Sequence, residues 1–306
     1  MPVIHVQSPG MFTTVQDLGR YGYGPIGVSP SGAADPIALR IGNLLVGNVE
    51  SDAALEMTLL GGTFVFPDGA IVALTGSDFS APIPMWTAHT LQPGETLKLG
   101  ATRSGARCYL CVHGGIAVKP LLGSASTHIL TGLGGFEGRP LTKGDVLRIG
   151  ESRESKPCVI VPEVLDKLTP RKMLRATIGP QTDWFKPESV RTFFSATYTV
   201  TEESNRMGLR LEGPPLDTPQ RGQMTSEGVS LGAIQVPAGG KPIILFVEQQ
   251  TTGGYPKIAN IVTADLPSVG QLRPRDEVHF DLVTPVYARA LIREQEELIQ
   301  SAVSFS

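Results

Sequence analysis

The sequence predicts a mainly β fold in two domains, and three observations support this. Gly 35 and Pro 25 together make up about a fifth of the 306 residues, while charged residues are only 18%, a balance typical of turn-rich β structure. Short apolar or alternating segments recur along the chain, and one pattern of segments occurs twice. At this length, each half can bury a core of its own.

The strand signals are short apolar runs bounded by turn residues. They fall at residues 61–66, 70–74, 95–99, 107–112, 233–236 and 242–247. Many short strands leave many edges, which proteins protect by closing a sheet into a barrel or by packing two sheets together. We therefore expect β-barrels or sandwiches.

Two helices stand out against this β background. Asp35 and Pro36 supply an N-cap and a proline at the first helical position, apolar residues follow at helical spacing, and Gly47 can end the helix. A second helix begins at Thr284 and Pro285 and carries an apolar stripe opposite an acidic face. We interpret it as a solvated surface helix.

The repeated pattern consists of a strand, a glycine pair and a closing segment with a turn around an aspartate. In the first half these parts are residues 108–112, 114–115 and 141–149, and in the second half 242–247, 253–254 and 272–280. A repeat of about 140 residues indicates a duplicated domain and not a solenoid. The polar segment 150–157 is the natural linker, so the predicted domains are 1–155 and 156–306.

Charge and apolar patterning argue against several classes of partner. The net charge is −3 and no basic run occurs, which disfavours nucleic acid. The N-terminus lacks the basic and apolar regions of a signal peptide, and no apolar stretch approaches the roughly 18 residues that a membrane span requires. We expect a soluble cytoplasmic protein. Its three cysteines are too few for a disulfide framework.

Several common catalytic patterns are missing from the sequence. The glycine spacing at 22–27 fits a dinucleotide fingerprint, but Pro25 interrupts it and no strand precedes it. No P-loop, no serine nucleophile elbow and no zinc-type histidine pair occurs. Cys108 and Cys111 are three apart on a predicted strand, so their thiols should face opposite sides and share no metal. A nucleotide, if used, is expected on another chain.

The most informative segment is 250–256, which follows the predicted strand 242–247. Gln250, Thr251 and Thr252 offer uncharged hydrogen-bonding groups, and Gly253 with Gly254 lets the backbone approach a ligand closely. Tyr255 completes the segment. The alternative is a polar hairpin turn, because glycine pairs are ordinary turn residues. The repeat gives this segment a counterpart at His113, beside Gly114 and Gly115.

Two arginines are further candidates for binding a small anion. A guanidinium can grip a carboxylate or phosphate with a planar fork of donors. Arg20 ends a polar segment, and the alternative is an internal tie to Asp17. Arg206 has an amide, Asn205, and a glycine, Gly208, as neighbours, which favours a site. His113 is equally consistent with a structural histidine.

An ordered set of motifs resembles a known family. The matching segments are residues 13–20, 31–35, 43–48, 55–59, 204–208, 235–237 and 250–256. Together they resemble the C-subunit family of bacterial 5-oxoprolinase, also described as allophanate hydrolase subunit 2 and as an antagonist of the Kip kinase inhibitor. The motifs run in order over nearly the whole chain, so they are highly specific to the family and less so to one activity within it.

The resemblance implies a fold, a reaction and partners. It implies two cyclophilin-like β-barrel domains from an internal duplication, with a few short helices. It also implies ATP-dependent opening of the 5-oxo-L-proline lactam to L-glutamate, together with the A and B subunits of the enzyme, of which the second is Kip inhibitor-like. We expect ATP on a partner chain, and no metal or biotin attachment in this chain. The expected substrate-binding residues are Arg20, His113, Asn205, Arg206, Gln250, Thr251, Thr252, Gly253, Gly254 and Tyr255; none is assigned as catalytic.

Two other functions stay open within the resemblance. One is a biotin-dependent carboxyltransferase acting on a urea-like substrate, which would need a separate biotin carrier. The other is a regulatory antagonist of a kinase inhibitor. One departure concerns Glu248, where many relatives are expected to have aspartate. We interpret its longer carboxylate as holding the hairpin, in preference to catalysis.

Overall fold

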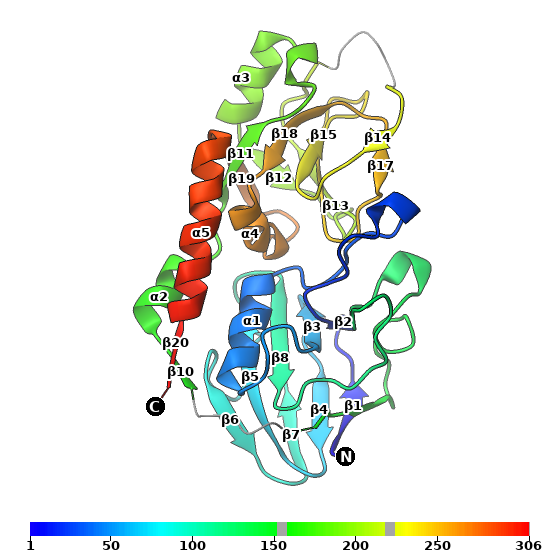
Figure 1. Ribbon diagram of the computed structural model, residues 1–306, viewed down its shortest axis with the longest axis vertical. Helices are drawn as coiled ribbons and strands as arrows, with labels where there is room; N and C mark the ends of the chain where they lie inside the picture. The colour runs from blue at the N-terminus through cyan, green and yellow to red at the C-terminus, as the bar shows by residue number, and fades with distance from the viewer. Residues whose placement is uncertain (152–157, 218–223, 306) are drawn as a thin grey trace. The chain divides into compact units, whose positions relative to one another are not determined.

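The computed structural model describes residues 1–151, 158–217 and 224–305, and it is mainly β, as predicted (Figure 1). Two compact units form from different parts of the chain. Unit 1 contains Met1–Arg20, Ser31–Thr169 and Glu296–Ser306, and unit 2 contains Tyr21–Pro30 and Pro170–Gln295. The domain boundary expected near residue 155 lies outside the described residues.

Unit 1 contains two antiparallel sheets and one strand pair. The four-stranded sheet has the order β7 (Glu95–Lys98), β4 (Thr63–Phe66), β1 (Val3–Ser8) and β9 (Val146–Arg148). The five-stranded sheet has the order β2 (Phe12–Gln16), β3 (Ala54–Thr58), β8 (Arg107–Val112), β5 (Ala70–Gly76) and β6 (Ala88–Leu91). The pair is β10 (Cys158–Ile160) with β20 (Val303–Phe305). One hydrophobic cluster draws side chains from both sheets, so they enclose a common core.

Helix α1 (Pro36–Leu45) covers the other face of the five-stranded sheet (Figure 1). Its predicted start is confirmed, since the Asp35 carboxylate accepts the Ala38 N–H at 3.1 Å and Pro36 occupies the first turn. Side chains alternate between the two faces of β8, so Cys108 lies in the core between the sheets and Cys111 lies under α1. The predicted separation of these two thiols is confirmed.

Unit 2 is built on a closed seven-stranded barrel. Its order is β11 (Met173–Ile178), β18 (Lys257–Ile261), β15 (Ala233–Gln235), β16 (Ile243–Leu245), β13 (Gly208–Glu212), β12 (Tyr198–Val200) and β19 (Glu277–Leu282). β19 returns beside β11 as its parallel neighbour and closes the barrel. A short ribbon pairs β14 (Glu227–Gly228) with β17 (Thr252–Gly253).

The remaining described elements are helices. The further α-helices are α2 (Pro162–Lys167), α3 (Pro187–Ser195), α4 (Leu266–Gly270) and α5 (Pro285–Ser301), and the short 3-10 turns are η1 (Gly24–Ile26), η2 (Ile129–Thr131), η3 (Thr182–Trp184) and η4 (Thr263–Asp265). The predicted C-terminal helix is therefore present as α5. Within the described residues, no helix combines the length and apolar character that a membrane crossing needs.

The two closing segments paired by the sequence pattern form the same kind of turn. In unit 1, the Val6 N–H donates to the carbonyl of Asp145 at 2.9 Å, and the Val6 carbonyl accepts the N–H of Gly144 at 2.8 Å. In unit 2, Val200 makes the same two bonds around Asp276, at 2.9 and 2.7 Å. Each aspartate side chain also accepts the backbone N–H of the residue three positions earlier, Thr142 for Asp145 at 2.7 Å and Arg273 for Asp276 at 2.9 Å. The turn predicted around each aspartate is confirmed.

Candidate functional site

The segment 250–256 does not fold back on the strand that precedes it. Residues 252–253 form β17, and they pair with β14 in the register Gly228 to Thr252 and Glu227 to Gly253. The hairpin alternative is therefore wrong for this segment. The pairing fixes the segment at one edge of unit 2, next to the buried residues that follow β16.

Arg206 is held by Glu248 within unit 2. The two residues are only 6% and 2% exposed, and Arg206 Nε donates to the Glu248 carboxylate. The Glu248 N–H also donates to the Arg206 carbonyl at 2.9 Å. The carboxylate therefore anchors the loop that carries Arg206, and it balances the guanidinium charge where both are shielded from water.

Asn205 shapes the same loop. Its side chain is exposed, and its Oδ1 accepts the backbone N–H of Met207 at 2.8 Å and of Gly208 at 3.4 Å. This is a local asparagine turn. The side chain is thus engaged in forming the loop that leads into β13.

Two glutamines, Gln235 and Gln250, lie beside the glycine of β17, and a third, Gln249, bonds to Val229. Gln250 Nε2 donates to Gln235 Oε1 at 3.3 Å, and Gln249 Nε2 donates to the Val229 carbonyl at 3.2 Å. Gln235 is 1% exposed and Gln249 is 6% exposed. The sequence pattern indicated Gln250 but did not indicate Gln235 or Gln249. The motif at 235–237 and the position of Gln249 directly before the segment were the available signals.

A buried lysine lies in the same region. Lys257 is 3% exposed, and its ammonium group contacts the Glu227 carboxylate. Gln181 joins the two, because its Nε2 donates to Glu227 at 2.9 Å and its Oε1 accepts the Lys257 N–H at 3.1 Å. The hydrogen bond from Lys257, helped by the one from Gln181, lowers the pKa of Glu227 although its partial burial opposes this. Glu227 is therefore a carboxylate near neutral pH.

The other residues of the segment divide between inside and outside. Thr252 is exposed and Tyr255 is 37% exposed. Thr251 and Gly254 are half-buried, and their carbonyls accept backbone N–H groups at 3.1 and 3.2 Å. The segment therefore presents a hydroxyl and a phenol to solvent and keeps its glutamine and Gly253 toward the protein.

Arg20 lies in unit 1 and is almost fully buried, at 2% exposed. Its Nη2 donates to the Ser126 carbonyl and its Nε to the Leu121 carbonyl at 3.4 Å. The Asp17 carboxylate accepts the Ser124 hydroxyl and the Ala125 N–H, each at 2.6 Å. Asp17 and Arg20 thus hold the same loop, so Arg20 is engaged internally.

His113 is also placed in unit 1, but it contacts a different segment from Arg20. Its Nδ1 lies 2.6 Å from the Val46 carbonyl oxygen. The next residue, Gly114, has φ of 91° and donates to Asn48 Oδ1 at 2.8 Å. The segment that follows α1 therefore fixes the orientation of His113. Apart from Arg20 and His113, the predicted substrate-binding residues all lie in unit 2.

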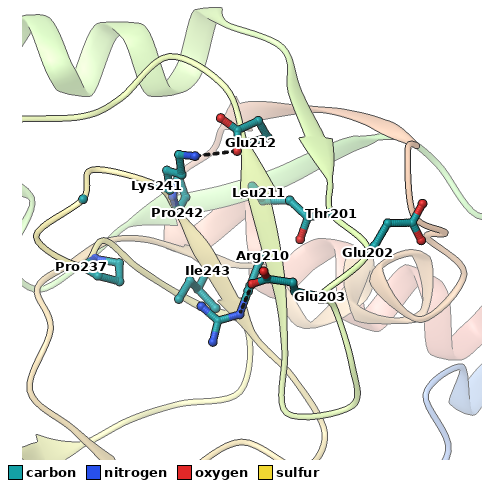
Figure 2. Close-up of a pocket in the computed structure, with 11 residues that line it drawn as sticks. Thr201, Glu202, Glu203, Arg210, Leu211, Glu212, Pro237, Lys241, Pro242 and Ile243 are labelled. Carbon is teal, nitrogen blue, oxygen red and sulfur yellow. Dashed lines mark hydrogen bonds and ion pairs between the residues drawn. The ribbon is translucent and has the colours of Figure 1, made fainter.

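A pocket of about 560 Å³ opens on the strands of unit 2 (Figure 2). Its charged lining is balanced by ion pairs, Arg210 with Glu203 at 3.6 Å and Lys241 with Glu212 at 2.7 Å. None of the ten predicted substrate-binding residues lines it. The pocket is therefore separate from the candidate site around 250–256.

Comparisons with known proteins identify the family of this chain. A family described as carboxyltransferase domain, subdomain A and B, matches residues 26–282. The chain belongs to the carboxyltransferase domain family. One relative within it, the C subunit of 5-oxoprolinase from Escherichia coli strain K12, is 41% identical over 276 residues, which are 89% of this chain and 88% of the relative. The C subunit from Haemophilus influenzae is 36% identical, and the match covers 92% of both chains.

The same carboxyltransferase fold occurs in a solved structure. The urea carboxylase of Kluyveromyces lactis matches 98% of this chain with a TM-score of 0.93 and 32% identity, and the match covers 29% of that longer protein. The resemblance expected from the motifs is thereby confirmed. The bacterial relatives are parts of a multi-chain enzyme, so homology identifies this chain as an enzyme subunit.

Proposed function

We propose that this chain is the C subunit of a cytoplasmic, ATP-dependent 5-oxoprolinase and helps the A and B subunits to hydrolyse 5-oxo-L-proline to L-glutamate. The observation that carries the proposal is the 41% identity to the C subunit of a 5-oxoprolinase over nearly the full length of both chains. The urea amidolyase of Saccharomyces cerevisiae is 36% identical, but the match covers only 18% of that longer protein.

The chemistry of the reaction explains the division of labour. A lactam is a stable amide, so transfer of a phosphoryl group to its carbonyl oxygen creates a better leaving group before water attacks. The sequence has no phosphate-binding loop of the P-loop type, and we assign ATP to a partner chain. This chain contributes neutral hydrogen-bonding side chains around Gln250, which suit an uncharged amide.

The test is reconstitution with candidate A and B subunits. The three chains are mixed with 5-oxo-L-proline, and glutamate formation is measured with and without ATP. We expect ATP-dependent glutamate only when all three are present. A stable three-chain complex that forms no glutamate would refute the proposal, and activity that persists without this chain would remove it from the site.

A carboxyltransferase acting on a urea-like substrate is the second candidate. The TM-score of 0.93 to a urea carboxylase favours it. Such a reaction needs a biotin carrier, whereas hydrolysis of the lactam does not. The same complexes are therefore assayed with urea, bicarbonate and a biotinylated carrier protein; carboxylation that depends on this chain would favour the second candidate.

A further inference from the structure

Two buried glutamines of unit 2 each retain one polar atom that has no hydrogen-bond partner within the described protein. These atoms are Nε2 of Gln235 and Oε1 of Gln249. The other end of each amide is fixed, because Gln235 Oε1 accepts from Gln250 and Gln249 Nε2 donates to the Val229 carbonyl. The bond to a backbone carbonyl requires nitrogen at the bonded end of Gln249, and the structure assigns oxygen to the bonded end of Gln235. One buried donor and one buried acceptor are therefore available to a ligand, and native proteins rarely leave such groups unpaired.

Lys257 adds a cation next to the available donor. Gln235 on β15 is paired in register with Lys257 on β18, immediately after an irregularity in the ladder. Directly opposite residues on neighbouring strands place their side chains on one face, with Cβ atoms about 5 Å apart, and bulges commonly direct side chains at sites. Glu227 accepts one hydrogen bond from the ammonium group, which has three N–H donors in all.

Gly253 explains why a glycine stands beside these groups. A Cβ at Gly253 would overlap Gln235 Nε2 and would lie 3.4 Å from Gln250 Nε2 and 3.2 Å from the Val229 side chain. The φ of Gly253 is not in the left-handed region, so backbone conformation does not require glycine here. The absent side chain instead lets the Gln235 amide pack directly against the Gly253 backbone, which holds the amide donor in place.

We propose that Gln235, Gln249 and Lys257 form a recognition site for a small cyclic amide that carries a carboxylate. The Gln235 Nε2 group donates to the amide carbonyl, the Gln249 Oε1 atom accepts the amide N–H, and the Lys257 ammonium binds the carboxylate. 5-Oxo-L-proline has these three groups around one ring nitrogen. The inference deepens the proposed function and rests on it for the identity of the ligand.

The test measures ligand binding to the complex of this chain with the A and B subunits by calorimetry. The probes are 5-oxo-L-proline, 2-pyrrolidinone, which lacks the carboxylate, and L-proline, which lacks the carbonyl. We expect Gln235→Met and Gln249→Met each to weaken binding of both lactams about 10-fold, as for one lost hydrogen bond. The double variant Lys257→Met with Glu227→Gln should weaken only 5-oxo-L-proline. L-Proline should bind poorly to every form.

Thermal midpoints separate recognition from a structural role. Gln235→Met and Gln249→Met each remove one internal hydrogen bond together with one unpaired buried atom, so both variants should remain folded with a small fall in midpoint. Gln181→Met is the matched control, because both ends of its amide are bonded; its midpoint should fall further. Loss of binding together with loss of folding in the Gln235 and Gln249 variants would overturn the proposal.

The outcomes distinguish this inference from the proposed function. Glutamate formation with the same KM in wild type, Gln235→Met and Gln249→Met would overturn the recognition site and leave the proposed function standing. Lactam binding that depends on Gln235, in a complex that forms no glutamate, would support the site and refute the function. If the two polar atoms hold only water, no lactam will bind in a way that depends on them, and the proposal fails.

Discussion

Arg206 and Glu248 are joined twice within unit 2, by an ion pair between their side chains and by a hydrogen bond between their backbones. The guanidinium Nε donates to the carboxylate, and the Glu248 N–H donates to the Arg206 carbonyl at 2.9 Å. Both side chains are shielded from water. The pair therefore connects the loop before β13 to the segment after β16, and the two stretches are positioned together.

Removing one member of this pair should destabilise the protein strongly. Glu248→Leu or Arg206→Met removes one charge of a buried ion pair, and we expect a loss of about 3 kcal/mol in the free energy of unfolding for each. The double variant should lose much less than the sum, because no isolated charge remains. Urea denaturation of the four proteins gives this double-mutant cycle. Additive losses would show that the two charges do not depend on each other.

The role of Glu248 shows what the sequence could predict. Its carboxylate was interpreted as structural, and in the structure it accepts a hydrogen bond from Arg206. Arg206 was predicted to bind substrate because a guanidinium is a good anion ligand. Its partner lies 42 positions away, and no local pattern indicates which distant strands will meet.

Local signals were sufficient for much of the fold. Asp35 and Pro36 predicted the start of α1, and alternating residues predicted that Cys108 and Cys111 face opposite sides. Gln235 and Gln249 were missed for a physical reason. An uncharged glutamine has no characteristic spacing, and its importance appears only when burial and pairing show which of its atoms lack partners.

Two buried tyrosines should respond oppositely to loss of the hydroxyl. Tyr109 donates to Glu56 at 2.7 Å and accepts the Asp35 N–H at 2.8 Å, so Tyr109→Phe should cost about 2 kcal/mol. The Tyr198 hydroxyl is buried without a partner in the described protein, so Tyr198→Phe should be neutral or stabilising by up to about 1 kcal/mol. Chemical denaturation measures both; equal losses would contradict the assignment.

Tyr198 should also contribute to unfolding at high pH. Burial raises the pKa of its phenol to about 12, above the value near 10 for an unfolded chain. A raised folded-state pKa means that stability is complete below about pH 10 and decreases as the pH rises from there to about 12. Stability measured against pH should fall less steeply over this range for Tyr198→Phe than for wild type. Identical slopes would be inconsistent with a buried phenol.

The turn around Asp145 should weaken in acid. The hydrogen bond from Arg139 lowers the pKa of Asp145, although burial opposes it, and the Thr142 N–H adds to the effect. A lowered folded-state pKa means that its contribution is present above about pH 4 and is lost as the pH falls through the folded-state value. Asp145→Asn should remove this part of the acid dependence and cost about 1 kcal/mol at pH 7.

Arg139 supplies the check on that assignment. Arg139→Gln should remove the larger part of this acid dependence, because it takes away the main group that favours the carboxylate, while the Thr142 N–H remains. The double variant should then behave like Asp145→Asn in denaturation curves recorded from pH 7 to pH 3. If Asp145→Asn keeps the wild-type acid dependence, the Arg139 contact does not stabilise the charged form.

The glycine of β17 gives a direct test of the position of the Gln235 amide. Gly253→Ala would place a methyl group against Gln235 Nε2, which is the end of a flexible side chain and can move at little cost to folding. We therefore expect an unchanged thermal midpoint but a KM for 5-oxo-L-proline raised about 10-fold, since the amide donor is displaced. Gly228→Ala in the neighbouring strand is the matched control, because no atom lies within 4 Å of the position that its Cβ would take. A KM that is the same in both variants would mean that the position of the Gln235 amide does not matter to the substrate.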